Sequence, residues 1–150
     1  MSIKKPLLIL GAALLSASAQ ARTASCASAD EAQVAALFDR WNASLATLDP
    51  DRVVANYATD GVLLPTVSNQ PRGNPAEIRD YFVSFLQKKP QGKIDRRFVK
   101  IGCNLATDVG TYTFSFKDGS KVSARYSFVY EFKDGGWLIA HHHSSAMPEK

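Results

Sequence analysis

Residues 121–145 read KVSARYSFVYEFKDGGWLIAHHHSS, and this stretch decides the fold. Apolar and polar side chains alternate in two runs that flank Lys133-Asp134-Gly135, which predicts two antiparallel strands joined by a tight turn. The same tripeptide, Lys117-Asp118-Gly119, precedes the first run. The stretch therefore predicts two consecutive hairpins with similar turns.

The remainder of the chain supplies helices first and strands afterwards. The period of two begins at Lys93 and predicts strands at 93–101, 108–117, 121–133 and 136–145. Upstream, a capping box at Ser28–Glu31 opens a long helix. Its apolar stripe consists of Val34, Leu37, Phe38, Trp41, Leu45 and Leu48.

Two segments that begin with a capping residue followed by proline predict shorter helices. Asp49-Pro50 starts a helix that runs through Tyr57, a short strand follows at 61–65, and Asn74-Pro75 starts a helix that stops before Pro90. Helices followed by a meander of strands predict an α+β fold, with three N-terminal helices packed on one face of a curved, mostly antiparallel sheet.

The pattern of the first hairpin selects its turn. Only a three-residue turn with a glycine bulge, in which residue 116 faces residue 120, places Val122, Ala124 and Tyr126 on the face of Tyr112. By analogy, the second hairpin takes the same turn. The expected inner face then carries Tyr126, Phe128, Tyr130, Phe132, Leu138, Ala140, His142 and Ser144. The expected outer face carries Arg125, Ser127, Val129, Glu131, Trp137, Ile139, His141 and His143.

The three consecutive histidines do not predict a metal site. Successive strand side chains point to opposite faces, so His142 cannot share an ion with His141 and His143, and no third ligand is in place. His142 and Ser144 point inward, but the inward set shows no acid that would complete a triad. His142 is therefore interpreted as a polar group at a pocket wall or, alternatively, as a buried histidine satisfied by a tyrosine such as Tyr126.

The N-terminus predicts export. Lys4 and Lys5 precede an apolar run, and Ala19-Gln20-Ala21 resembles a cleavage site, so residues 1–21 are interpreted as a signal peptide and 22–150 as one domain. The expected location is periplasmic or secreted, with no membrane contact after cleavage. Removing the two lysines leaves 16 basic against 14 acidic residues, a net charge of +2 instead of +4. So small a charge, without a basic cluster, argues against nucleic-acid binding.

The chain has two cysteines, Cys26 and Cys103. An even number in an exported protein favours a disulfide, with two free thiols as the alternative. The sequence contains no C-x-x-C motif that would indicate a thiol-redox or zinc site, and no cofactor is expected.

The segments LFDRWNASLATLDPDRVVANYATDGVLLP (37–65) and VSARYSFVYEFKDGGWLIAHHHSSAMP (122–148) resemble a nuclear-transport-factor-2-like, cone-shaped domain. The ending Asp-Gly-x-Trp-x-Ile-x-His-x-His-x-Ser is similar to the association (hub) domain of calcium/calmodulin-dependent protein kinase II, especially to its exported bacterial relatives. The resemblance covers residues 30–148. It implies a conical pocket and assembly through the outer face of the sheet. The hub's pocket arginines align with Tyr112, Phe128 and Ser144, and no kinase motif is present.

Combined with the face assignment, the resemblance predicts a homodimer or higher oligomer with an aromatic-lined pocket for a small organic ligand. The expected lining is Tyr57, Tyr112, Tyr126, Phe128, His142 and Ser144, and the expected interface is Arg125, Val129, Trp137, Ile139, His141 and His143. An alternative is a cofactor-free isomerase or dehydratase of the polyketide-cyclase-like type with His142 as general base. A third hypothesis is a purely structural interaction module.

Overall fold

The computed structural model describes residues 25–148 of the 150-residue chain, so the expected signal peptide lies outside the described residues. None of the helices within 25–148 is long and apolar enough to cross a membrane. The elements are α1 (Glu31–Ala46), α2 (Pro50–Val54), β1 (Tyr57–Leu64), α3 (Pro75–Phe85), the 3-10 turn η1 (Leu86–Lys88), β2 (Gln91–Gly102), β3 (Leu105–Ser115), β4 (Lys121–Lys133) and β5 (Gly136–Ala146).

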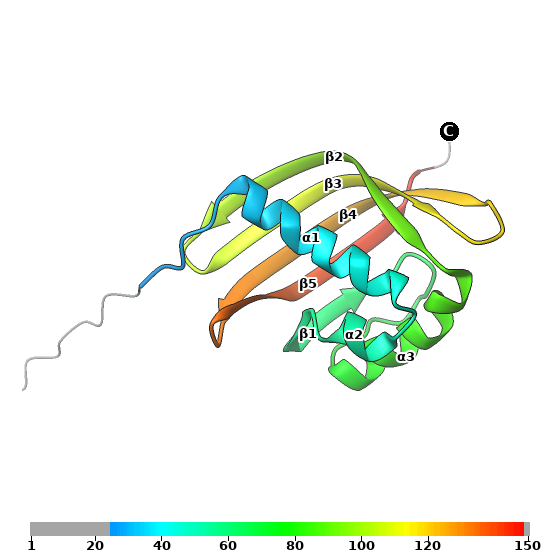
Figure 1. The fold of residues 1–150 in the computed structure, drawn as a ribbon, viewed down its shortest axis with the longest axis horizontal. Helices are drawn as coiled ribbons and strands as arrows, with labels where there is room; N and C mark the ends of the chain where they lie inside the picture. The colour runs from blue at the N-terminus through cyan, green and yellow to red at the C-terminus, as the bar shows by residue number, and fades with distance from the viewer. Residues whose placement is uncertain (1–24, 149–150) are drawn as a thin grey trace, which may run out of the picture.

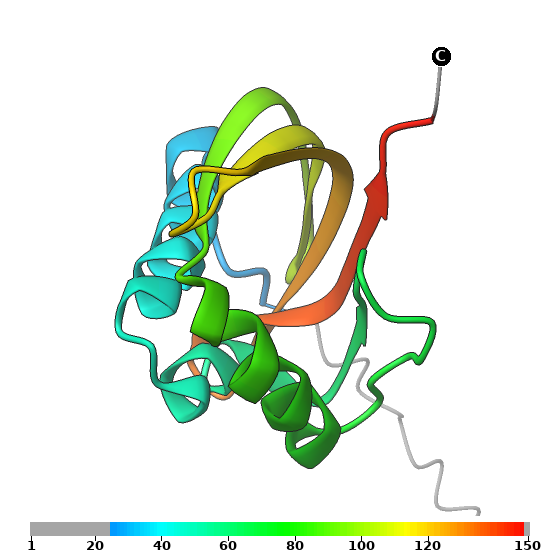
Figure 2. The same ribbon diagram turned by 90° about the vertical axis from the view of Figure 1, so that its right-hand side faces the viewer.

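The strands form one mixed sheet in the order β1-β5-β4-β3-β2. β1 pairs parallel with β5, and the other neighbours are antiparallel. Helix α1 crosses the concave side of the sheet, while α2 and α3 lie beside β1 (Figure 1). Viewed from the end, the strands arch around α1 (Figure 2). This arrangement confirms the predicted α+β cone, with the core between α1 and the sheet.

Two features of β2 and β3 accompany the arch of the sheet. The pairing of β2 with β3 shifts between Ile94 and Arg96, which marks a β-bulge. Opposite the bulge, a β-carbon on Gly110 would lie 1.9 Å from the carbonyl oxygen of Arg96. Only glycine permits the two backbones to approach so closely, so Gly110 allows the local bend.

Helix α1 begins at Glu31, and its N-cap lies two residues after the predicted cap, Ser28. Asp30 is the N-cap, its side chain accepts from the Gln33 N–H at 2.7 Å, and the Gln33 side chain accepts from the Asp30 N–H at 2.8 Å. The prediction of a box at Ser28–Glu31 was wrong because the cap and its reciprocal hydrogen bond are made by Asp30 and Gln33, while the residues before them bond to Asn104 in the β2–β3 turn. The apolar stripe is confirmed for Val34, Phe38, Trp41 and Leu45, which are all at most 2% exposed.

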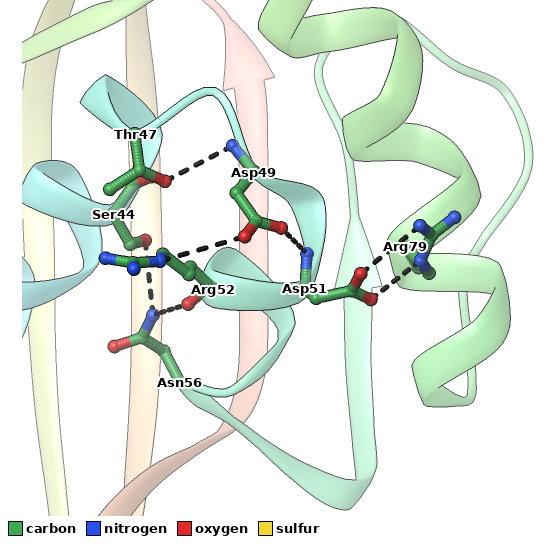
Figure 3. Close-up of polar contacts among 7 residues, drawn as sticks. All are labelled: Ser44, Thr47, Asp49, Asp51, Arg52, Asn56 and Arg79. Atoms are coloured by element: carbon green, nitrogen blue, oxygen red, sulfur yellow. Dashed lines mark hydrogen bonds and ion pairs between the residues drawn. The ribbon is translucent and has the colours of Figure 1, made fainter.

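Helix α2 ends at Val54, and the chain enters β1 at Tyr57 instead of continuing as a helix. The backbone carbonyl of Asn56 accepts from the Ile139 N–H at 2.8 Å, so pairing with β5 overrides the local helical preference. The Asn56 side chain donates to Ser44 and to the carbonyl of Arg52 (Figure 3). These bonds fix the position at which β1 starts.

Helices α2 and α3 are joined at the surface by an ion pair. Arg79 donates to both carboxylate oxygens of Asp51, at 2.7 and 3.2 Å (Figure 3). Asp51 also lies in the first turn of α2, where the Asp49 side chain accepts from its N–H at 2.9 Å. This cap and the ion pair hold the short α2 against α3.

The two Lys-Asp-Gly hairpins do not share one turn. In the first, the Phe116 N–H donates to the Ser120 carbonyl and Gly119 has φ +83°, which confirms the three-residue bulged turn. In the second, Lys133 pairs with Gly136, and Asp134 and Gly135 have φ of +53° and +82°. Positive φ at both central residues defines a two-residue type I′ turn, so the predicted analogy between the hairpins was wrong.

A bulge in β5 compensates for the shorter turn. Val129 pairs with His141 but Tyr130 pairs with Ile139, so Ala140 is the additional residue. The bulge reverses the phase of the strand, and His142 therefore points inward as predicted. Between the turn and the bulge, the prediction was wrong: Ile139 and Trp137 face the core, and Leu138 does not.

A disulfide joins Cys26 to Cys103, as the sequence predicted. Next to it, the Asn104 side chain accepts from the Ala27 N–H at 2.7 Å and donates to the Ser25 carbonyl at 3.3 Å. The N-terminal segment is thus fastened to the β2–β3 turn. In the usual chain-entropy model, a bridge across a 77-residue separation contributes about 4 kcal/mol to the free energy of unfolding.

Candidate functional site

His142 is buried on the inner face of β5, with 3% of its surface exposed. Its ring stacks on Phe128 with a centroid separation of 4.0 Å, and the ring of Trp41 approaches edge-on at 5.2 Å. Its Nδ1 atom lies 2.9 Å from the hydroxyl of Tyr57, the first residue of β1. Three elements, α1, β1 and β4, therefore fix the orientation of the imidazole.

The surroundings of His142 keep its imidazole neutral. Burial, with smaller contributions from His141 and His143, lowers the pKa of His142 to about 3. Burial also raises the pKa of Tyr57 well above its usual value, so its hydroxyl retains its proton. Nδ1 of His142 lies within hydrogen-bond distance of this hydroxyl, and the indole of Trp41 is a second polar neighbour that partly opposes the rise in its pKa.

The direction of the Tyr57 contact follows the tautomer of His142. With the hydroxyl as donor to Nδ1, the proton of the neutral imidazole resides on Nε2. Nε2 is buried, and within the described residues it has no hydrogen-bond partner. His142 thus keeps one ring nitrogen, an N–H donor in this tautomer, that the described residues do not satisfy.

A group of hydroxyls lies one inward position further along β5. Ser144 contacts the hydroxyl of Thr66 and receives a hydrogen bond of 2.5 Å from the hydroxyl of Tyr112. Thr66 belongs to the loop that follows β1. This contact joins the loop to the inner face of the sheet.

His142 and Ser144 line a cavity of about 40 Å³ between α1, α3 and the sheet. The volume admits roughly three water-sized spheres, or one end of an organic molecule. Thr66 and Tyr112 are also in the lining, and no aspartate, glutamate, lysine or arginine is. Most of the wall is aromatic, from Trp41, Tyr81, Phe82, Phe85, Phe114 and Phe116.

The match to known proteins agrees with this architecture. Residues 30–148 match the family model of the calcium/calmodulin dependent protein kinase II association domain. The chain belongs to this family. A solved structure described as such an association domain, from Xanthomonas campestris, is 51% identical, with a TM-score of 0.76, and the match covers 85% of this chain and 99% of that one.

More distant structures share the fold alone. An NTF2-like protein of unknown function from Pseudomonas putida has a TM-score of 0.72 at 18% identity, over 83% of this chain and 92% of that one. A protein with a cystatin-like fold from Nostoc punctiforme has a TM-score of 0.68 at 18% identity, and the match covers 79% of this chain and 92% of that one. A search of curated proteins found no match.

Within this association-domain chain, three of the six predicted lining residues line the cavity: Tyr112, His142 and Ser144. The other three are buried without lining it. Tyr57 supports His142 from behind, and Phe128 lies against its ring. Tyr126 donates to Asp108 at 2.7 Å, so it is not the partner of His142 that the sequence suggested.

Two kinds of lining residue were not predicted from the sequence. Trp41 and Phe82 carried the pattern of ordinary core positions on helices, and nothing in their spacing distinguishes a cavity wall from a filled core. Thr66 and Val67 lie in a polar loop whose path depends on tertiary contacts. The Leu63 and Arg72 backbones exchange hydrogen bonds of 2.8 and 2.9 Å, which close this loop over the cavity.

A second buried polar cluster lies across the inner face from His142. Asp108 on β3 is 0% exposed, and it accepts from Tyr126 at 2.7 Å and from Nε of Arg97 at 2.9 Å. Burial raises the pKa of Asp108 and these hydrogen bonds oppose that shift. Nη2 of Arg97 and the hydroxyl of Tyr130 are buried without a partner among residues 25–148.

The expectation that the inner face of the sheet carries no acidic side chain was wrong, because Asp108 lies on it. The alternation of Tyr112 and Phe114 along the predicted strand already placed residue 108 on the inner face, so the signal was available. Asp108 does not complete a triad, because its hydrogen bonds go to Tyr126 and Arg97. Within residues 25–148, no group of three or more histidine, cysteine, aspartate or glutamate residues is placed to hold a metal ion.

The predicted interface residues divide between the two faces. Arg125 and His143 are exposed, and Val129 and His141 are half-buried, on the outer face of β4 and β5. Ile139 is 0% exposed and belongs to the core, and the half-buried Trp137 packs against the core. The type I′ turn causes this difference, because it shifts the pairing by one residue before the bulge.

Proposed function

We propose that this association-domain protein is exported, forms oligomers and binds a small organic molecule in the His142 cavity. The observation that carries the binding proposal is the buried Nε2 of His142, which has no partner among the described residues, on a side chain that lines a largely aromatic cavity. In the proposal this nitrogen carries the imidazole proton and faces the cavity. Leaving a buried polar group unpaired costs about 1–3 kcal/mol, so a ligand oxygen that accepts from it gains most of that free energy. Aromatic walls with few oriented polar groups are typical of sites for small organic ligands.

Two features support export. The N-terminal sequence has the order of a signal peptide, and the Cys26–Cys103 disulfide fits an oxidising compartment such as a periplasm. Comparing the mass of the protein purified from the periplasmic fraction with that of the full chain tests this. A mature chain that starts at Arg22 supports export, and an uncleaved cytoplasmic protein contradicts it.

Self-association is supported by the name of the family and by the outer face of the sheet. This face presents half-buried Val129 and His141 beside exposed Arg125 and His143. Partly apolar sheet faces with arginine and histidine suit protein contacts. Light scattering at micromolar concentration is expected to give a dimer or larger, and a monomer would contradict the proposal.

Binding is favoured over proton-transfer catalysis by the composition of the lining. With its pKa lowered to about 3, His142 is a weak base at neutral pH. Burial raises the pKa of Tyr81 and Tyr112, so they do not accept protons either. An isomerase needs a group that removes a substrate proton, whereas a neutral N–H donor needs only an oxygen to bind.

Calorimetric titration with 4-ethylphenol tests the binding proposal. We expect a dissociation constant on the order of 0.1–1 mM, as for a ligand of this size. His142→Phe keeps an aromatic ring but removes the donor, and it is expected to weaken binding by about tenfold. His143→Phe makes the same change on the outer face and serves as the control. Absence of binding to the wild-type protein, or equal binding by both variants, would contradict the proposal.

A further inference from the structure

The His142 cavity adjoins a larger hollow, and the two share part of their lining. Val67, Phe85, Phe116 and Val122 line both the cavity and an outer hollow of about 490 Å³. The inner cavity, at about 40 Å³, is much smaller than the pockets of about 300–1,000 Å³ that enclose whole organic ligands. A ligand whose oxygen reaches His142 must therefore extend past these four side chains into the outer hollow.

The outer hollow is a defined part of the fold. It lies between η1 and the β3–β4 turn, and the Lys117 N–H donates to the Lys88 carbonyl at 3.0 Å. This bond joins the two segments that form the rim. Val67, 58% exposed, forms the third side from the loop after β1. The floor is apolar, and the charged groups lie at the rim.

The rim carries two amino groups that are not in ion pairs, although the charge of Lys88 helps to lower the pKa of Asp118. Lys88 and Lys117 line the hollow, and neither forms an ion pair within residues 25–148. Lys88 Nζ lies 6.0 Å from the centre of the Phe116 ring, directly above the apolar floor. Asp118 is the acid at this rim, and its carboxylate accepts from the N–H and the hydroxyl of Ser120 at 2.9 and 2.6 Å. The rim is therefore net positive.

A neighbouring hollow does not offer the same charge. Lys88 lines this hollow as well, but its other two charged side chains, Arg72 and Asp80, neutralise each other in an ion pair of 3.0 Å. Two amino groups outside ion pairs, Lys88 and Lys117, meet only at the outer hollow among the hollows within residues 25–148 described here. Charge complementarity distinguishes this rim as the place for an anionic group.

We infer that the ligand is an amphipathic aromatic anion, with an oxygen at His142, a ring between Val67 and Phe116, and an acidic group at Lys88 and Lys117. This inference rests on the proposed function and adds the chemical class of the ligand. The aromatic floor provides edge-on and stacked contacts for a ring, and the lysines provide charge at the solvent boundary. A carboxylate is the simplest such acidic group.

Five matched probes of three kinds test the inference by calorimetry: 4-ethylphenol, the three 4-hydroxyphenyl alkanoates from acetate to butanoate, and 3-phenylpropanoate. We expect the best hydroxyphenyl acid to bind about fivefold more tightly than 4-ethylphenol at low salt. High salt is expected to remove this gain, because the rim is exposed to solvent. 3-Phenylpropanoate, which lacks the hydroxyl, is expected to bind about tenfold more weakly than its hydroxylated counterpart.

Lys88→Gln/Lys117→Gln is the decisive variant, because it removes both charges and leaves the backbone bond between the segments. It is expected to bind the acids and 4-ethylphenol equally, while Lys100→Gln, on β2, retains the gain. If 4-ethylphenol binds through His142 but no acid binds more tightly, or the gain survives Lys88→Gln/Lys117→Gln, the inference is overturned and the proposed function stands. If no phenol binds, both are overturned.

Discussion

His142 and Asp108 occupy one cross-strand row of the inner face, with Phe128 between them, yet their surroundings differ. Both side chains are at most 3% exposed. Asp108 is held by Tyr126 and Arg97, whereas His142 is held on Nδ1 alone and keeps Nε2 free at a cavity. A buried polar group with its partners in place stabilises the fold, and the unpaired Nε2 on a residue that lines a cavity supports the proposed ligand site.

The largest expected effect comes from removing the carboxylate of Asp108, both of whose oxygens accept hydrogen bonds. Asp108→Ala is expected to lower the free energy of unfolding by about 3 kcal/mol, because Arg97 and Tyr126 lose their buried acceptor. Urea unfolding measures the change. Asp60→Ala removes a surface carboxylate whose contact with Lys133 is 3.7 Å and is expected to cost less than about 0.5 kcal/mol. Equal losses for the two variants would show that Asp108 is not a structural anchor.

Lowering the pH separates the two groups, because protonation of His142 destabilises the folded state and protonation of Asp108 favours it. His142 has a lowered pKa in the folded protein, so the unfolded chain binds the proton more readily. Its contribution to stability is complete above the unfolded value of about 6.5 and is lost as pH falls toward 3. The pKa of Asp108 is raised, so its protonation favours the folded state.

Comparing the pH dependence of stability in the wild-type protein and in His142→Phe isolates the contribution of His142. Between pH 7 and pH 5, the wild-type protein is expected to lose about 2 kcal/mol more of its unfolding free energy than His142→Phe does. Urea titrations at both pH values, on both proteins, give this number. Parallel losses in the two proteins would mean that His142 is protonated without cost in the folded state.

The smallest expected effect concerns the single bond that His142 makes. A double-mutant cycle of Tyr57→Phe and His142→Phe is expected to give a coupling of about 1 kcal/mol, as for one neutral hydrogen bond. The double variant is expected to be nearly as stable as the wild-type protein, because it removes both partners and the unpaired Nε2–H. A strongly destabilised double variant would assign His142 a structural role like that of Asp108.

The two Lys-Asp-Gly hairpins show how far the sequence predicts the fold. The alternation of apolar residues predicted the class, the four long strands and the turn at Gly119. It could not predict that the second tripeptide forms a shorter turn, because a bulge at Ala140 restores the inward direction of His142. A three-residue turn, or a two-residue turn followed by a bulge, gives the same alternation of side chains in the distal part of β5. The sequence pattern alone therefore does not distinguish the two arrangements.

The candidate site was predictable in part for similar reasons. Periodicity placed Tyr112, His142 and Ser144 on the inner face, and the same argument applied to β3 would have found Asp108. The closure of the cavity by Thr66 and Val67 depends on the Leu63–Arg72 backbone pair, which joins positions without a periodic signal. Whether a space between aromatic side chains is filled or empty depends on their packing in three dimensions.

The central claim is that His142 presents a neutral Nε2–H to the cavity. Nitrogen-15 NMR of the imidazole near neutral pH, with and without 4-ethylphenol, tests it most directly. We expect a bare Nδ1 and a protonated Nε2 in the free protein, with the Nε2–H signal shifting as the phenol is added. The account would be contradicted by an imidazolium, by a proton on Nδ1, or by an Nε2–H signal that does not shift when the phenol is added.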